Sequence, residues 1–144
     1  MSGYREIALS DLDDAIFNLK HGRYRLAVYC FQQYAEKSAK ALLEKTNPLN
    51  RMMNSHVIER VLEAYDDAHK TSDIADKARY LTGFYFNTRY PGDNYAEISQ
   101  AQAQKAYAFA MELEVYFKAE LLALEEMISS VTVDIENFPR LDME

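Results

Sequence analysis

The feature that most constrains the fold is a long apolar and alanine-rich stretch in the second half of the chain. It opens at Ser99 and Gln102, whose spacing gives the reciprocal capping pattern of a helix start. The composition then stays apolar or alanine-rich almost to Met127. A helix over residues 99–127 would be on the order of 43 Å long at about 1.5 Å per residue. Such a helix is long enough to brace a whole helical bundle.

Apolar residues that recur at three- and four-residue spacing predict further helices before this one. The first should begin at the N-cap Ser10 and stop at Gly22, because serine caps helix starts and glycine favours helix ends. The last of these helices precedes Pro91. Because proline disfavours the helical conformation of the residue before it, this helix should end at or just before Tyr90. We expect these helices over residues 10–21, 24–45, from Asn54 or Ser55 to about Tyr65, and 72–90.

Glycine and proline are scarce, with four and three residues among 144, which argues against an all-β fold with many turns. The hydrophobic content of 49% suffices for one core in one domain. Short connections make sequential helices antiparallel neighbours. We therefore predict an all-α, up-and-down four-helix bundle with an additional short helix. It should occupy residues 1–128, followed by an irregular C-terminal tail over residues 129–144.

Charge, cysteine content and hydropathy limit the function classes. The net charge is −7, yet residues 1–72 hold ten basic and ten acidic residues, whereas residues 73–144 hold six and thirteen. A nucleic-acid surface is therefore expected in the first half. The single Cys30 excludes an internal disulfide and a cysteine-based zinc site, and we expect it to pack in a helix. Without a signal-peptide pattern or a membrane-length apolar run, we expect a cytoplasmic protein and no membrane insertion.

Two stretches together resemble the HEPN domain, an α-helical bundle. Residues Gly22–Ala27 running into Phe31–Lys40 are similar to the second helix of that family, and Tyr85–Pro91 ends in the Arg-Tyr-Pro motif of one branch. His56 is a weaker match, and the resemblance covers about residues 8–125. It implies a domain that is usually dimeric and that binds nucleotides or RNA, or acts as the partner of a minimal nucleotidyltransferase in toxin–antitoxin or defence pairs.

Many members of that family are metal-independent ribonucleases, and these carry an Arg followed a turn or two later by a His. No His follows Arg89 in this chain, so the resemblance favours a non-catalytic binding module. The same spacing occurs once, at Arg51 and His56, in the loop before the third helix. There a His could move a 2′-hydroxyl proton and an Arg could stabilise the phosphate. A ribonuclease toxin is one alternative, and a purely structural interaction protein is another.

Ligand-binding candidates come from arginine, lysine and tyrosine side chains. Arg89, beside Tyr90, could hold a phosphate through its planar fork, or could satisfy helix carbonyls or pair with a carboxylate. The cluster Arg23, Tyr24 and Arg25 could stack a base and hold its phosphate, or Tyr24 could anchor the second helix. Lys37 and Lys40 form a basic strip with Gln33, or a solvated face stitched by the pair Glu36–Lys40. The three histidines lack ligand spacing, so we expect no metal and no cofactor.

Overall fold

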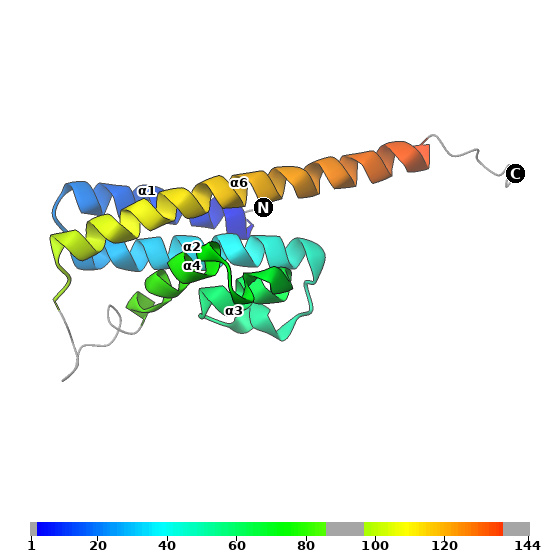
Figure 1. Ribbon diagram of the computed structural model, residues 1–144. Coiled ribbons are helices and arrows are strands. Elements are labelled where there is room, and N and C mark those ends of the chain that lie inside the picture. The colour runs from blue at the N-terminus through cyan, green and yellow to red at the C-terminus, as the bar shows by residue number, and fades with distance from the viewer. Residues whose placement is uncertain (1–2, 86–96, 137–144) are drawn as a thin grey trace, which may run out of the picture.

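The computed structural model describes residues 3–85 and 97–136, with side chains up to residue 129. Within these residues the chain is helical and contains no strand. The α-helices, labelled in Figure 1, are α1 (Tyr4–Lys20), α2 (Tyr24–Thr46), α3 (Ile58–Tyr65), α4 (Asp73–Thr82) and α6 (Gln100–Glu136). Two short 3-10 helices join them, η1 (Arg51–Asn54) and η2 (Asp67–Lys70). The predicted all-α helical bundle is confirmed.

Helix α2 is the centre of the bundle. It contacts α1 and α6 on one side and α3 and α4 on the other, as Figure 1 shows. Most of its residues between Ala27 and Leu43 are buried, as expected for a helix packed among neighbours on several sides. Phe31 and Tyr34 are fully buried, and the Tyr34 ring meets Phe117 of α6 edge-on at 6.0 Å between centroids. The core therefore lies along α2, and the exposed ends and loops around it can carry binding sites.

The start of α1 differs from the prediction. The helix begins at Tyr4, and Ser10 lies inside it instead of capping its start. The reason is tertiary, because Arg5 of the first turn donates hydrogen bonds to Glu114 of α6 at 2.8 and 2.5 Å. Ala8 in the next turn is fully buried. The helix end agrees with the prediction, since Gly22 adopts a φ of +73°, which glycine tolerates better than other residues.

The capping of α3 joins it to α4. Ser55 accepts a hydrogen bond from the Val57 amide, and α3 begins at Ile58, a few residues later than expected. The Ile58 amide donates to Thr82 Oγ1 at 3.0 Å, so the last residue of α4 caps the start of α3. The predicted start of α4 near residue 72 is confirmed, and the Ser72 hydroxyl caps it by accepting a hydrogen bond from the Ala75 amide.

The end of α4 and the end of α6 both require corrections. The helix predicted over residues 72–90 is interrupted, because α4 ends at Thr82 with Gly83 at its C-cap, consistent with the low helix propensity of glycine. Residues 84–85 are helical again, and the predicted end near Tyr90 lies outside the described residues. The reciprocal capping box of Ser99 and Gln102 is confirmed by bonds of 3.1 and 2.9 Å. However, α6 continues to Glu136, so residues 129–136 are helical and not an irregular tail. Extending a long helix adds one hydrogen bond per residue without a new nucleation cost, and this outweighs the β-branched residues at 131–133.

Candidate functional site

A pocket at the start of α2 contains the basic-aromatic cluster that the sequence singled out. Its volume is about 350 Å³. The turn at Gly22 brings the cluster beside the chain segment that leads into α6. The lining residues are Gly22, Arg23, Tyr24, Arg25, Leu26, Glu97 and Ile98. The structure therefore brings all three predicted residues of the cluster to one concave surface.

The residues of this pocket differ in their exposure and in the polar groups that they offer to a ligand. Arg23 is exposed, and Tyr24 is half-buried and packs against the core, so this ring also anchors α2. No side chain caps the start of α2, which leaves the positive end of a 23-residue helix available to an anion. Glu97 adds one carboxylate, which can accept a hydrogen bond from a hydroxyl or an amine. The pocket can therefore hold a phosphate beside a polar group and a flat ring.

The two lysines predicted on α2 lie elsewhere. Lys37 donates to Asp11 of α1 at 2.6 Å. Lys40 has 6% of its surface exposed and donates to Glu36 at 3.1 Å. The expected Glu36–Lys40 pair is confirmed, but it lies in the core and not on a solvated face or an exposed basic strip. Both ammonium groups have a carboxylate partner, and neither lysine lines the pocket at the start of α2.

Glu36 is the centre of a buried polar cluster on α2. It is 4% exposed and accepts hydrogen bonds from Gln32 at 2.9 Å and from Lys40 at 3.1 Å. His56, from the connection before α3, adds a third contact, with its Nδ1 atom 3.1 Å from Glu36 Oε1. Because a carboxylate accepts, this contact assigns the ring proton to Nδ1. Three donors thus compensate the loss of water around one carboxylate.

The imidazole of His56 is fixed on a second side by Tyr85. The two rings stack with centroids 4.4 Å apart and an angle of 14° between their planes. The His56 side chain nevertheless remains about 50% exposed, and its Nε2 atom has no hydrogen-bond partner among the described residues. Tyr85 opens the stretch that ends in the Arg-Tyr-Pro motif. Arg89 and Tyr90 themselves lie outside the described residues.

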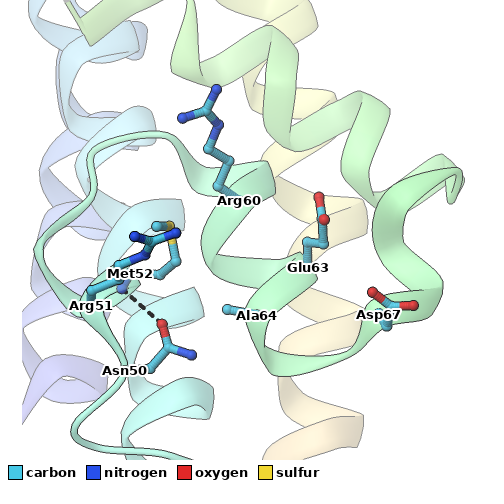
Figure 2. A pocket seen from close by; sticks show the side chains of 7 residues that line it. All are labelled: Asn50, Arg51, Met52, Arg60, Glu63, Ala64 and Asp67. Carbon is cyan, nitrogen blue, oxygen red and sulfur yellow. Dashed lines mark hydrogen bonds between the residues drawn. The ribbon is translucent and has the colours of Figure 1, made fainter.

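Arg51, the other member of the predicted catalytic pair, lines a different pocket. Figure 2 shows this pocket between η1, α3 and η2, where Arg51 lies beside Met52. His56 is not among its lining residues and is directed to Glu36 of α2 instead. The pairing of Arg51 with His56 stays a prediction, and the partner that the structure gives His56 is a carboxylate.

The other reactive side chains have packing roles in the described residues. His69 is buried, with Nδ1 at 2.7 Å from the Ser72 hydroxyl and Nε2 at 2.6 Å from the Tyr116 hydroxyl. Burial, with a smaller effect from Asp11 and Asp14, raises the pKa of the Cys30 thiol to about 11, which disfavours the nucleophilic thiolate. In the part of the chain that the structure describes, no three metal-ligating side chains lie close enough to hold an ion, and no helix has the length and hydropathy of a membrane span.

Comparison with known proteins agrees with this architecture. Residues 1–120 match the model of the HEPN domain. The chain belongs to the HEPN family. The fold is similar to the crystal structure of an archaeal HEPN homologue, with a TM-score of 0.64 and 23% sequence identity over 83% of this chain and 98% of that one. No curated protein matches the chain. At this identity the likeness to the archaeal HEPN structure concerns the fold alone.

The HEPN-domain residues that sequence reasoning missed are those that meet through the tertiary fold. The i,i+4 spacing of Glu36 and Lys40 predicted their contact, but not their burial. The contact with His56 joins positions 20 residues apart, and helical periodicity carries no information about it. The available signal was the group of polar residues Gln32, Gln33 and Glu36 within about one turn of α2. Polar groups that become buried in a helical core need hydrogen-bond partners.

Proposed function

We propose that this HEPN protein is a non-catalytic binding module for nucleotides or RNA. The observation that carries the proposal is the pocket at the start of α2, where Arg23, Tyr24 and Arg25 meet. Arginine binds phosphate oxygens through two parallel N–H groups. An aromatic ring beside it can stack a base with little sequence preference. Family membership supports the same class of ligand, because the HEPN domain matches residues 1–120.

In this proposal the exposed Arg23 holds a phosphate near the uncapped start of α2, and the edge or face of Tyr24 contacts the base. Glu97 accepts a hydrogen bond from a sugar hydroxyl or an exocyclic amine. Arg89 and Tyr90 of the Arg-Tyr-Pro motif lie outside the described residues, and we propose them, from the motif alone, as a further phosphate contact and a further ring. Lys37 and Lys40 are left out of this site, because Lys37 pairs with Asp11 at the partly exposed α1–α2 contact and Lys40 pairs with Glu36 in the core.

Arginine variants test the proposed site. Arg23→Ala and Arg89→Ala should each weaken the binding of a short single-stranded RNA by about tenfold, since each removes a charge-assisted contact. Arg89→Lys should also bind more weakly, because an ammonium group cannot reproduce the bidentate fork. Fluorescence anisotropy measures the affinities, and the melting temperature of each variant is measured alongside.

The matched control is Lys118→Ala, which removes an exposed positive charge from α6, away from this pocket. It should leave RNA affinity nearly unchanged. If Lys118→Ala and Arg23→Ala lowered RNA affinity equally, binding would depend on net charge and not on the pocket. A large fall in melting temperature with unchanged affinity for Arg89→Ala would assign that residue to the fold.

Homodimerisation belongs to the same proposal. Val115 and Leu122 are 73% and 55% exposed on α6, and their spacing of two helical turns puts them on one face. Burial of such side chains in a symmetric interface would remove them from water. We expect a dimer by light scattering at tens of micromolar, and a monomer for the double variant Val115→Asp/Leu122→Asp. A wild-type protein that is monomeric at that concentration would contradict this prediction.

A minimal nucleotidyltransferase is the proposed macromolecular partner, in a toxin–antitoxin-like or defence-related pair. The support is the Arg-Tyr-Pro ending of the Tyr85–Pro91 stretch, which resembles the branch of the family associated with such enzymes. Co-expression of this chain with a nucleotidyltransferase encoded beside it tests the idea. Co-purification in a fixed ratio supports the pair, and separate elution contradicts it.

A metal-independent ribonuclease is the second candidate, and the geometry of His56 favours it. The buried Glu36 holds Nδ1, so Nε2 is presented at the surface as a proton acceptor, the arrangement that orients a catalytic histidine. The opposing observation is that Arg51 lines another pocket. RNA cleavage without added metal that disappears in His56→Ala would establish this function and overturn the non-catalytic proposal.

A further inference from the structure

The pocket between η1, α3 and η2 has the features of a second, separate binding site. Its volume is about 470 Å³, within the range of small-molecule sites in proteins. It shares no residue with the pocket at the start of α2. The side chains that line it are drawn in Figure 2, and they belong to Asn50, Arg51, Met52, Arg60, Glu63, Ala64 and Asp67.

Opposite charges occupy opposite sides of this pocket. Figure 2 shows Arg51 and Arg60 on the left and the carboxylates of Glu63 and Asp67 on the right. Met52 and Ala64 are partly buried against the hydrophobic core and supply apolar surface, Met52 beside Arg51 and Ala64 between the two sides. The pocket therefore has a cationic wall, an acidic wall and an apolar floor.

Three of the four charged groups of this pocket have no ion pair with a described residue. Arg51, Arg60 and Glu63 form no ion pair with any described residue, and only Asp67 has one, with Lys70 at 3.0 Å. In contrast, Arg5 and Lys37 each have a carboxylate partner within 2.6 Å. The two pocket arginines and the Glu63 carboxylate thus keep their hydrogen-bonding capacity for a ligand.

We propose that this pocket binds a small zwitterionic ligand, with an anionic group on one end and a primary amine on the other. Arg51 and Arg60 hold the anion, because two guanidinium groups match the oxygens of a phosphate or a carboxylate. Glu63 accepts hydrogen bonds from the amine. A purely anionic ligand would leave the Glu63 carboxylate without a partner and next to another negative charge. A purely cationic ligand would leave the two arginines without a partner and next to another positive charge.

The test uses defined probes and the methyl group of Met52 as a reporter inside the pocket. O-phosphoethanolamine and 4-aminobutanoate carry both charges, with phosphate and carboxylate as the respective anions. Inorganic phosphate carries only negative charge, and ethylamine carries only positive charge. We expect at least one zwitterion to shift the Met52 methyl resonance and to bind about tenfold more tightly than inorganic phosphate or ethylamine, since a second charge-assisted contact is formed. Which zwitterion binds more tightly identifies the anionic group.

Two variants and one control assign the contacts. Arg60→Ala should weaken the zwitterion and inorganic phosphate alike by about tenfold. Glu63→Gln should lower the affinity of the zwitterion to that of its anion alone, without weakening inorganic phosphate. Lys118→Ala lies on α6 outside the pocket and should change neither. The proposal is overturned if neither zwitterion shifts the Met52 methyl at tens of millimolar, or if Glu63→Gln leaves the advantage of the zwitterion intact.

Discussion

Replacing Glu36 with alanine is expected to lower the free energy of unfolding by about 3 kcal/mol or more, because it leaves a buried ammonium without its carboxylate. Lys40 is 6% exposed and donates to Glu36, and Gln32 is fully buried beside it. The variant also removes the contact that holds His56 to α2. Urea unfolding followed by circular dichroism measures the loss.

The matched control for this prediction is Glu44→Ala, on the same helix but exposed. Exposed positions away from such contacts usually change stability by less than about 0.5 kcal/mol. The double variant Glu36→Met/Lys40→Met should lose much less than the sum of the single changes, since no buried charge is left alone. Equal effects of Glu36→Ala and Glu44→Ala would show that the Glu36 ion pair is not buried in solution.

The second large effect is expected for Glu114→Ala, which should lower the free energy of unfolding by about 2–3 kcal/mol through the loss of charge-assisted bonds. Glu114 accepts two bonds from Arg5, at 2.8 and 2.5 Å, and one from the Tyr34 hydroxyl at 2.5 Å. Burial, followed by the bond to Glu114, raises the pKa of Tyr34, so its hydroxyl stays a donor at neutral pH. One carboxylate therefore joins α1, α2 and α6.

Hydrogen exchange distinguishes this contact from general stability. Relative to the wild-type protein, Glu114→Ala should accelerate amide exchange in α1 more than in α2, because the contact of Arg5 with α6 is lost. Glu112→Ala is the control. Glu112 is 58% exposed, and its one described ion pair is a long contact of 3.6 Å with Lys77. Such a surface pair contributes less than about 1 kcal/mol. Uniform acceleration over all helices would contradict a local role for Glu114.

Local signals predicted the helices but not all of their limits. The capping box at Ser99, the start of α4 near residue 72 and the stop at Gly22 are set by a few neighbouring residues, and all are confirmed. The start of α1 could not be read in the same way. Its first turn is held by Arg5 through a contact 109 residues away, which overrides the capping preference of Ser10.

The candidate site shows the same division. Arg23, Tyr24 and Arg25 are adjacent in sequence, so their meeting in one pocket could be predicted. The partners of His56 and the burial of Lys40 depend on how α2 packs against the connection before α3. Likewise, the charged pocket of Figure 2 combines residues from three elements, and no sequence motif joins them.

The central claim is that the HEPN domain binds RNA or nucleotide without cleaving it, and one measurement addresses both halves. End-labelled single-stranded RNA is incubated with the protein in the presence of EDTA, the complex is separated on a native gel, and the RNA recovered from it is sized on a denaturing gel. We predict a complex that contains full-length RNA, and a much weaker complex for Arg23→Ala. Absence of any complex with the wild-type protein, or cleaved RNA that becomes intact again in His56→Ala, would contradict the claim.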